Sequence, residues 1–406
     1  MDSAILAAGE SRRLKPLTYN IHKSLLEFLG KPFISYIAQE QAAAGIRIKY
    51  IVSNSNYYER FSHCFPDAHV LVQEKPLGTA DAARLALQGA EGSLLIQYGD
   101  NLVMSDSLSE LLRAHNGQIA TVGVIKVNDP ENYGVVRTDK NGNLEEVIEK
   151  PAKAESNLVL AGIYIFEPEF KEFLDKVTPS KRGELELTDA LNQASNTADI
   201  NTVTIDNGSW HDLTYPWDIL EINSFLIKRL KGEIYGEVES NVHMEGQIYV
   251  GKGSRIRSGS YIEGPVWIGN DVDIGPNAYI RPFSSISSNS RIGNACEVKD
   301  SVIYRNVHIS HLSYVGDSVI GENTNLGAGT ITANLRLDDK DIVAHIEGNK
   351  IPTNRRKLGC FIGPNVKTGV NVSINPGIKI GANAYIYPGC VVNRDVGEGE
   401  KYKCQP

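Results

Sequence analysis

Residues 256–286 read IRSGSYIEGPVWIGNDVDIGPNAYIRPFSSI. An aliphatic residue stands at every sixth position of this stretch, and the residue four places after it is small or short. The same register extends in both directions and includes Val250, Ile256, Ile262, Ile268, Ile274, Ile280, Ile286, Ile292 and Val298. Six residues is neither a helical period nor that of an ordinary strand. A fixed six-residue repeat is typical of a parallel β-helix, in which stacked coils bury a continuous core.

The repeat continues toward the C-terminus with three interruptions. It slips at Ile303, slips again at Ile320 and resumes from Ile362. Residues 334–360 break it with an insertion that is rich in basic residues. An insertion from one corner of a solenoid usually forms its binding face. A β-sandwich would instead show period-two alternation with turns every 8–12 residues, which this pattern lacks.

The residues before the six-residue repeat show a different sequence pattern. Short apolar runs predict strands at 3–8, 48–53, 69–72, 93–98 and 120–127. Amphipathic patterns predict helices at 32–44, 79–88, 107–116 and 216–231. This alternation favours a mostly parallel sheet with helices on both faces. We therefore expect an α/β Rossmann-like domain at 1–232 and a β-helix domain at 233–406.

Composition excludes several classes of partner and compartment. The 406 residues carry a formal net charge of −8 with no long basic run, so nothing predicts nucleic-acid binding. No apolar stretch approaches the ~20 residues of a membrane span, and no signal peptide is evident, so we expect a cytoplasmic protein. The five cysteines are scattered without a CxxC pair, which predicts reduced thiols rather than a disulfide framework or zinc site. Cys296, Cys360 and Cys390 are expected to be small apolar core residues.

The first predicted strand runs directly into a small turn, Ala7-Ala8-Gly9. Backbone N–H groups in such a turn can cradle phosphate oxygens, and Arg13 and Lys23 add positive charge. Asp100 follows another buried strand, at the sheet edge where ligands bind, and Asp212 supplies a second carboxylate. Two aspartates with an oxygen-rich substrate suit Mg²⁺, although each aspartate alone is also an ordinary turn or cap residue.

His311 and Tyr314 interrupt the aliphatic pattern of the second half. Acetylation of an amine by a thioester needs a base for the amine proton, and histidine titrates near neutral pH. A single histidine at a solenoid corner is more often structural. Here Arg281 and Lys299 lie on nearby coils, where they could hold a sugar phosphate. The fold alone does not choose between an acyltransferase and a structural module.

Motifs throughout the N-terminal half resemble the sugar-1-phosphate nucleotidylyltransferases. They lie at residues 5–9, 13–18, 23, 73, 77–80, 99–100, 133–136, 149–151, 161–162, 184–189 and 210–212. Ser11 replaces the usual second glycine of the loop and is small enough to keep the turn, while Arg12 is expected to face solvent. His22 stands where a proline usually precedes the signature lysine.

This resemblance implies a site and a reaction. Arg13 and Lys23 would stabilise the α-phosphate and the departing pyrophosphate, and Asp100 and Asp212 would bind Mg²⁺. Nucleotide contacts would come from Ala7, Ala8, Gly9, Gln73, Gly78 and Thr79, and sugar-phosphate contacts from Gly134, Glu149, Lys150 and Gly162. A sugar-phosphate oxygen would attack the α-phosphorus of a nucleoside triphosphate in line. The Gln73 amide suits uracil or thymine, so UTP and dTTP both remain open.

The C-terminal half resembles the acetyltransferase half of the bifunctional uridylyltransferase/glucosamine-1-phosphate acetyltransferases, and the whole chain resembles their archaeal members. The resemblance implies a left-handed parallel β-helix of hexapeptide repeats, with acetyl-CoA as acyl donor and His311 as general base. Amino-sugar, phosphate and CoA contacts would come from Arg281, Lys299, Tyr314, Asn334, Lys340 and Arg394. Leu335 stands where the bacterial enzymes have tyrosine, so a gluco and a galacto amino sugar both remain open.

Two functions are therefore compatible with the sequence. A bifunctional enzyme would acetylate glucosamine-1-phosphate, or galactosamine-1-phosphate, and then transfer a uridylyl group to the product. Alternatively, a nucleotidylyltransferase would use UTP or dTTP with glucose-1-phosphate, and its β-helix would be only a structural and regulatory module. Flat-sided triangular prisms associate side by side, so we expect a homotrimer in either case.

Overall fold

The computed structural model describes residues 1–404, which form two compact units. The first unit contains residues 1–10 and 33–212, and the second contains residues 11–32 and the chain from Leu213 onward. Residues 11–32 therefore belong by their contacts to the same unit as the β-helix. The sequence pattern instead predicts them to be part of the domain at 1–232. None of the described helices is long and apolar enough to cross a membrane.

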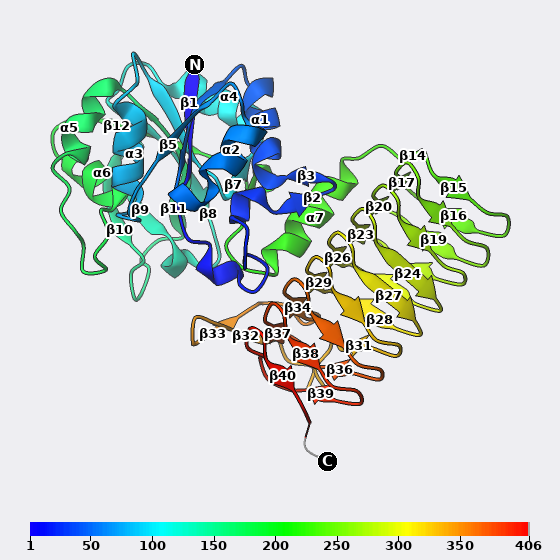
Figure 1. Ribbon diagram of the computed structural model, residues 1–406. Coiled ribbons are helices and arrows are strands. Elements are labelled where there is room, and N and C mark those ends of the chain that lie inside the picture. Colours follow the sequence, from blue (N-terminus) through cyan, green and yellow to red (C-terminus); the bar gives the residue numbers. More distant parts are fainter. Residues whose placement is uncertain (405–406) are drawn as a thin grey trace. The chain divides into compact units, whose positions relative to one another are not determined.

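The first unit is built on a nine-stranded sheet with the order β10-β9-β11-β6-β1-β4-β5, to which β8 is added beside β11, and β12 beside β8 (Figure 1). Its strands are β1 Asp2–Ala7, β4 Arg47–Ser53, β5 His69–Val72, β6 Leu94–Tyr98, β8 Ala120–Lys126, β9 Gly134–Thr138, β10 Leu144–Glu149, β11 Leu158–Phe166 and β12 Ile200–Thr204. The neighbours β6, β1, β4 and β5 are parallel, as predicted. Strand β11 is antiparallel to β6, β8 and β9, so the sheet as a whole is mixed.

Helices cover both faces of this sheet, as the alternation predicts. Adjacent residues of β6 point to opposite sides, so Leu95 and Ile96 belong to different apolar clusters. Leu95 packs with residues of α4 (Ser105–Ala114), and Ile96 packs with residues of α3 (Thr79–Leu87) and α6 (Leu187–Ser195). The remaining helices of this unit are α1 Phe33–Ala43, α2 Tyr58–Cys64 and α5 Lys171–Leu174.

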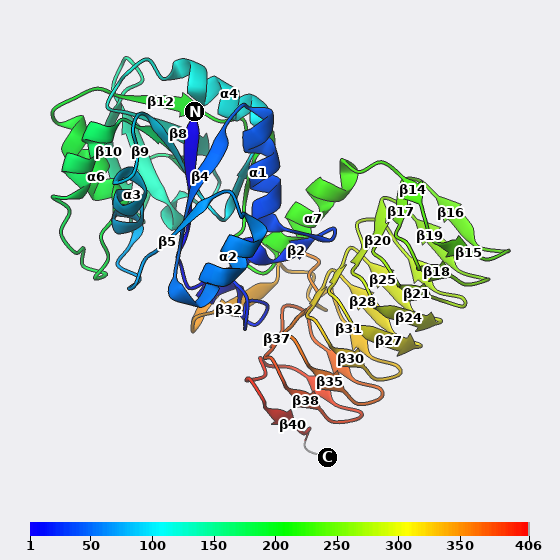
Figure 2. The same cartoon turned by 45° about the horizontal axis from the view of Figure 1, so that its top comes forward.

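The second unit contains a left-handed parallel β-helix whose short strands stack into three faces (Figures 1 and 2). Face 1 contains β14 Glu233–Ile234, β17 Ile248–Val250, β20 Val266–Ile268, β23 Ser285–Ile286, β26 Val302–Ile303, β29 Val319–Ile320, β34 Phe361–Ile362 and β37 Lys379–Ile380. Face 2 contains β15 Glu237–Val238, β18 Arg255–Ile256, β21 Asp273–Ile274, β24 Arg291–Asn294, β27 His308–His311, β30 Asn325–Leu326, β35 Lys367–Thr368, β38 Tyr385–Ile386 and β40 Lys401–Tyr402. Face 3 contains β16 His243–Glu245, β19 Tyr261–Glu263, β22 Tyr279–Ile280, β25 Glu297–Lys299, β28 Tyr314–Gly316, β31 Ile331–Thr332, β36 Ser373–Ile374 and β39 Val391–Val392.

The aliphatic repeat forms the core of the β-helix. Ile256, Ile274 and Ile292 occupy matched positions on successive coils, and each is fully buried. The slip at Ile303 is a coil shortened by one residue, because Ile303 still pairs with Ile286 inside the core. The sixfold pattern therefore predicted both the fold and its inward-facing residues.

Asparagines form a ladder along one corner of the β-helix. Asn306, Asn323, Asn365 and Asn383 adopt φ angles of 58°, 58°, 61° and 61°. The side-chain amide of each donates to the side-chain oxygen of the next, over 3.0, 3.1 and 3.0 Å. Asparagine tolerates the left-handed conformation better than most residues, so one residue type supplies both the turn and its hydrogen bonds.

Replacing Asn323 with alanine is expected to destabilise the β-helix by about 1–3 kcal/mol, because it removes two hydrogen bonds and forces alanine into the left-handed region. The Asn323→Gly variant removes the same bonds but accepts the backbone angle, so it should lose less stability. Thermal unfolding followed by circular dichroism compares the two. Equal midpoints for wild type and both variants would contradict a stabilising ladder.

The predicted insertion forms an antiparallel hairpin between β31 and β34. Its strands are β32 Val343–Ile346 and β33 Asn349–Pro352, which join through a turn at Glu347 and Gly348. The side chains of Ile342, Ala344 and Ile346 alternate into the interior, whereas residues 335–341 are exposed. The basic residues of this insertion are Arg336, Lys340, His345, Lys350, Arg355, Arg356 and Lys357.

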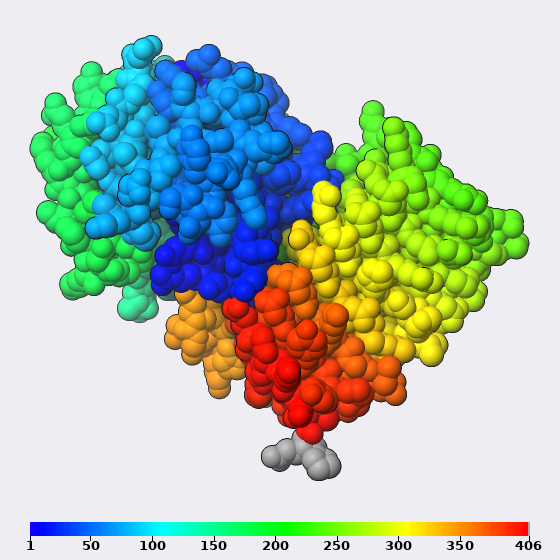
Figure 3. Space-filling view, in the orientation of Figure 1, coloured from blue at the N-terminus to red at the C-terminus, as the bar shows by residue number. Residues whose placement is uncertain are grey.

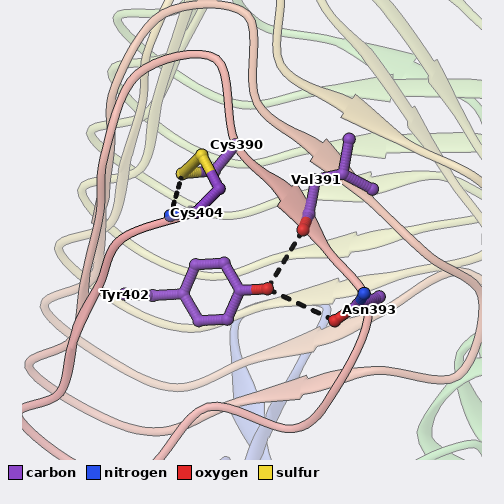
Figure 4. Close-up of a disulfide and its surroundings, with 5 residues drawn as sticks. All are labelled: Cys390, Val391, Asn393, Tyr402 and Cys404. Carbon is purple, nitrogen blue, oxygen red and sulfur yellow. Dashed lines mark hydrogen bonds between the residues drawn. A yellow bond between two sulfur atoms is a disulfide. The ribbon is translucent and has the colours of Figure 1, made fainter. Parts of the chain in front are cut away.

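The prediction that all cysteines are reduced is wrong for one pair. Cys390 and Cys404 form a disulfide, and the Cys404 N–H also points at the Cys390 sulfur (Figure 4). The final strand β40 pairs with β38, which returns the chain to the last coil and brings the two Cα atoms to 5.3 Å. Spacing along the chain could not reveal this return. Cys296 and Cys360 are free and buried in the core, as expected.

Candidate functional site

The turn after β1 presents exposed backbone at the carboxyl end of a central strand. β1 lies between β4 and β6 and ends at Ala7. Ala8 is buried, and its carbonyl oxygen accepts a hydrogen bond from the Asn54 side chain at 3.1 Å. A side-chain Cβ added to Gly9 would meet no atom within 4 Å. A hydrogen bond therefore holds the backbone of the turn at Ala8, and the space beside Gly9 is open, as a phosphate-binding turn requires.

The two candidate metal-binding aspartates lie on paired segments. Strand β7 (Asn101–Val103) begins immediately after Asp100 and runs antiparallel to β13 (Trp210–Asp212). Asn101 pairs with Asp212, so the second aspartate lies opposite the residue that follows the first. The Tyr133 hydroxyl donates to the Asp212 carboxylate at 3.1 Å.

This oxygen-only pair fits a hard divalent cation. Mg²⁺ commonly uses one or two protein carboxylates and completes its shell with water and phosphate. Within residues 1–404, no group of three or more His, Cys, Asp or Glu side chains could hold a metal. A closed protein cage is therefore not available in the described chain, and the pair suits an ion that arrives with a nucleotide.

The amide of Gln73 has a fixed orientation. Its nitrogen donates to the Gly78 carbonyl at 3.1 Å and to the Asp81 carboxylate at 2.8 Å, and the side chain is buried. Both partners are acceptors, so the NH₂ group must face them. The Gln73 carbonyl oxygen is then the part of this amide that can address a base, and it acts as an acceptor.

Gly78 and Thr79 are held by the segment before α6. Gly78 has φ +119°, and a Cβ there would lie 2.5 Å from the Leu185 carbonyl oxygen. The Thr79 hydroxyl oxygen accepts the Leu187 N–H at 3.0 Å. Gly78 thus permits a close backbone approach, and Thr79 has a structural partner besides any ligand.

Of the candidate sugar-binding residues, Gly134, Glu149 and Lys150 lie at the ends of β9 and β10, and Gly162 lies on β11. Gly134 pairs directly with Glu149, and a Cβ on Gly134 would lie 3.2 Å from a Glu149 carboxylate oxygen. The Lys150 N–H donates to the Tyr133 carbonyl at 2.9 Å. Gly162, at φ +72°, leaves the space for the Asn101 side chain, because a Cβ would approach its nitrogen to 2.5 Å.

Three contributing residues were not assigned roles from the sequence. Tyr133 connects the sugar residues to Asp212, Asn101 fixes the register beside Asp100 by donating to the Ala161 carbonyl at 2.8 Å, and Asp81 orients Gln73. Tyr133 directly precedes Gly134 in one of the motifs, and Asn101 directly follows Asp100. Their position next to predicted site residues was the only feature of the sequence that could have indicated these two roles.

Arg13 and Lys23 lie in the second unit, within residues 11–32. Ser11 adopts φ +54°, and its hydroxyl oxygen accepts the Lys23 N–H at 3.1 Å. Ser11 therefore keeps the turn that glycine usually makes. The Arg13 guanidinium lies 6.0 Å from the centre of the Tyr215 ring, and Arg12 is exposed, as expected.

Face 3 of the β-helix brings together most of the predicted acetyltransferase residues. Asp317 is buried and accepts hydrogen bonds from Lys299 at 2.9 Å and from the Asn334 amide. The Asn334 amide also donates to the Tyr314 hydroxyl at 3.0 Å. Burial raises the pKa of Tyr314, and the negative charges of Asp317 and Glu297 add to this effect.

The two cations predicted to hold a phosphate already have carboxylate partners. Arg281 pairs with Glu297 at 2.8 Å and Lys299 with Asp317 at 2.9 Å. The Arg281 Nε is nevertheless buried without a hydrogen-bond partner among the described residues. A phosphate would therefore join an existing ion-pair network, and it could satisfy this remaining donor.

The imidazole of His311 is exposed at the turn between β27 and β28, and it makes no hydrogen bond within residues 1–404. Its carbonyl oxygen accepts the Gly329 N–H at 3.1 Å, so the backbone is fixed while the ring is available. Lys340 lies on the exposed insertion loop, outside the network. Arg394 follows β39 on the same face and pairs with Glu400 at 2.7 Å.

The carboxyl group of Asp300, next to Lys299 in the sequence, has a raised pKa. Burial, together with the nearby Asp317 charge, raises the pKa of Asp300 to about 6, although Lys299, Arg355 and Lys228 act in the opposite direction. A pKa raised in the folded state means that ionisation costs stability, so the free energy of unfolding falls as the pH rises from about 4 through about 6.

We expect Asp300→Asn to raise the free energy of unfolding at pH 8 by up to ~3 kcal/mol, because one pKa unit corresponds to about 1.4 kcal/mol. At pH 4 the carboxyl is protonated in the folded state and about half protonated in the unfolded chain, so the variant should gain little. Urea unfolding at the two pH values gives the comparison. An equal effect at pH 4 and pH 8 would show that the Asp300 charge is not the cause.

Three parts of the chain match families of known proteins. Residues 3–229, more than half of the chain, match the nucleotidyl transferase family, so the chain is a nucleotidyl transferase. Residues 359–394 match the bacterial transferase hexapeptide family, and residues 262–351 match the family described as the GMPPB C-terminal domain.

Full-length relatives define the family more narrowly. A bifunctional sugar-1-phosphate nucleotidylyltransferase/acetyltransferase of Sulfurisphaera tokodaii is 42% identical over 405 residues, covering 99% of this chain and 100% of its own. The bifunctional protein GlmU of Methanocaldococcus jannaschii is 40% identical over 399 residues, covering 98% and 96%. A glucose-1-phosphate thymidylyltransferase of Streptomyces antibioticus is 31% identical over 339 residues, covering 80% and 92%. The chain belongs to the archaeal bifunctional sugar-1-phosphate nucleotidylyltransferase/acetyltransferase family.

Proposed function

We propose that the protein makes a UDP-N-acetyl-amino sugar in two steps. The β-helix acetylates glucosamine-1-phosphate or galactosamine-1-phosphate with acetyl-CoA, and the part of the chain that resembles the nucleotidylyltransferases, residues 1–232, then transfers a uridylyl group from UTP. The observation that carries this proposal is the exposed His311 imidazole, three residues from Tyr314 in a network that includes Asn334 and Lys299. A structural module needs none of these polar contacts.

In the acetylation step the amine of the sugar attacks the thioester carbonyl carbon. His311 takes the amine proton as the C–N bond forms; the C–S bond then breaks, and the protonated imidazole gives this proton to the departing sulfur, so that CoA leaves as the thiol. Tyr314 and Asn334 orient the sugar. Arg281, with its unpartnered Nε, and Lys299 receive the phosphate. Arg394 lies further along the same face, where an extended CoA would run, and Lys340 is a further candidate contact from the insertion.

In the nucleotidyl step an oxygen of the sugar phosphate attacks the α-phosphorus of UTP, and pyrophosphate leaves. Asp100 and Asp212 would hold Mg²⁺, which neutralises negative charge on the phosphates when bound. The backbone of residues 7–9 cradles the phosphates, and Arg13 and Lys23 supply positive charge. Gly134, Glu149, Lys150 and Gly162 form the sugar pocket.

The orientation of Gln73 supports a restricted set of bases. Its carbonyl oxygen accepts a hydrogen bond, so it suits the N3–H of uracil or thymine and disfavours cytosine and adenine, which present acceptors at the corresponding ring nitrogen. UTP and dTTP satisfy this requirement equally. We propose UTP as the natural donor because two-step amino-sugar activation ends in a uridylyl transfer in the family that this chain resembles.

A second candidate is a nucleotidylyltransferase whose β-helix only assembles the protein. Two observations favour it: Arg281 and Lys299 are already neutralised by carboxylates, and one relative covering most of the chain is a thymidylyltransferase. In that case acetyl-CoA would not be consumed, and glucose-1-phosphate with dTTP or UTP would release pyrophosphate.

A substrate survey decides between the two candidates. Purified protein is incubated with glucosamine-1-phosphate, galactosamine-1-phosphate or glucose-1-phosphate, with and without acetyl-CoA, and free thiol and pyrophosphate are measured separately. We expect thiol release with at least one amino-sugar phosphate. Pyrophosphate release from every sugar phosphate without any thiol release would establish the second candidate.

We also propose a homotrimer assembled through the faces of the β-helix. Leu312 and Ile331, beside the acetyltransferase network, leave 64% and 38% of their surface exposed. Large apolar side chains at these positions suit an interface between flat faces. Light scattering should give three times the mass of the chain, whereas a monomeric mass would contradict the proposal.

A further inference from the structure

The segment that carries Arg13 and Lys23 is anchored on the β-helix. Residues 11–32 belong to the second unit together with the stacked coils. We infer that the β-helix is the scaffold that positions this segment, so that nucleotidyl transfer depends on Glu27 and Arg305 as positioning residues. The inference rests on the proposed function, in which Arg13 and Lys23 act on the phosphates.

The first anchor is a hairpin. Strands β2 (Glu27–Phe28) and β3 (Lys31–Pro32) pair through a turn in which both central residues have positive φ, 46° at Leu29 and 82° at Gly30. The tip lies on Trp267 of β20, because a Cβ on Gly30 would be 3.2 Å from the indole ring. At the base of the hairpin, Glu27 pairs with the Arg305 guanidinium at 2.5 Å. This ion pair joins residues that lie 278 positions apart in the chain.

The second anchor lies near the C-terminal coils. A Cβ on Gly363, next to β34, would be 3.0 Å from the Pro16 side chain, so the two backbones approach closely. The Tyr19 hydroxyl interacts with Glu398 and Asn383, and the Glu398 carboxylate raises the pKa of Tyr19. Figure 3 shows the dark-blue surface of the N-terminal segment against the orange and red surface of the last coils.

The segment has little regular structure of its own. Apart from the two-stranded hairpin, residues 11–32 contain only the short turns at Arg12–Leu14 and Lys23–Leu25. Its conformation therefore depends on what it packs against. Lys23 lies four residues before Glu27, and a misplacement of about 1 Å in a catalytic group can reduce a rate about 100-fold. A loop held by a rigid scaffold is a common way to place such groups.

The Glu27–Arg305 pair is the contact best suited to a test. The side chain of Glu27 is 15% exposed and that of Arg305 is 43% exposed, so the pair is partly shielded from solvent. Arg305 follows β26, on the coil that continues into β27 and β28 with His311 and Tyr314. Substituting Glu27 leaves that coil unchanged, so acetyl transfer serves as an internal control.

The experiment uses the full-length variants Glu27→Gln and Arg305→Gln and the charge-exchanged pair Glu27→Arg with Arg305→Glu. We expect each single variant to lower kcat for nucleotidyl transfer about 5- to 20-fold with KM changed less than twofold, and the exchanged pair to recover most of the loss. Arg257→Gln is the matched control, because Arg257 pairs with Asp273 within the β-helix and should leave kcat unchanged.

Hydrogen exchange of residues 11–32 measures the positioning without any activity. Glu27→Gln should speed exchange in this segment, and Arg257→Gln should not. Unchanged exchange in Glu27→Gln, or unchanged kcat in an active enzyme, would overturn the inference. If the wild-type chain transferred no nucleotide, the proposed function would fail, and the exchange result alone would still decide whether the β-helix holds the segment.

Discussion

Replacing His311 with alanine should reduce acetyl transfer by about 10²- to 10⁴-fold, because removal of a general base typically costs that much. The imidazole is exposed and makes no hydrogen bond within residues 1–404, so its loss should barely change stability. Nucleotidyl transfer should remain at the wild-type rate when a preacetylated sugar phosphate is supplied. Thiol release from acetyl-CoA and pyrophosphate release from UTP report the two steps separately.

A second histidine, His308, provides a matched control for the His311→Ala variant. His308 lies on the same strand, β27, and is exposed, but it is three residues earlier and has no place in the proposed site. His308→Ala should therefore keep both activities. An equal loss of acetyl transfer in the two variants, or no loss in His311→Ala, would contradict the role of His311 as base.

Replacing Asp100 with asparagine should lower nucleotidyl transfer by about 10³-fold and leave acetyl transfer unchanged. The substitution keeps the shape of the side chain but removes half of the carboxylate charge in the pair that Asp100 and Asp212 form through the β7–β13 register. A hard divalent cation depends on such charge. The variant should also need a higher Mg²⁺ concentration for half-maximal rate.

Asp67 provides the control for this charge change. It is exposed after α2, and Asp67→Asn should behave as wild type in both assays. Asp212→Asn should reproduce the Asp100→Asn defect, and the double variant should be little worse than either single variant, since both act through one bound ion. Independent, multiplicative losses would argue against a shared metal site.

The sequence predicted the β-helix because its core repeats. An inward aliphatic residue at every sixth position leaves one arrangement in which Ile256, Ile274 and Ile292 can all be buried. In the first unit, period and turn residues predicted β1, β4, β5, β6 and β8 and the helices α1, α3 and α4, but no element between residues 128 and 215, where β9 to β12, α5 and α6 lie. They could not predict the antiparallel β11, because strand direction in a sheet depends on long-range pairing rather than on local pattern.

The candidate site, like the fold, was predicted only in part. Motifs predicted Gly9, Gln73 and Asp100 as site residues, since their chemistry depends on residue type at a fixed spacing. The partners of these residues could not be predicted: Asp81 fixes the Gln73 amide, and Tyr133 reaches Asp212 from a distant strand. The disulfide between Cys390 and Cys404 was missed for the same reason, because the return of the chain in β40 is a tertiary contact.

We propose that one chain carries out both reactions in order. The most direct measurement is mass spectrometry of the products formed from glucosamine-1-phosphate or galactosamine-1-phosphate with acetyl-CoA, UTP and Mg²⁺. We predict a UDP-N-acetyl-amino sugar, formed together with one free CoA thiol per molecule, and its absence when acetyl-CoA is omitted. A uridylyl-sugar product with no CoA release from either amino sugar would contradict acetylation by the β-helix.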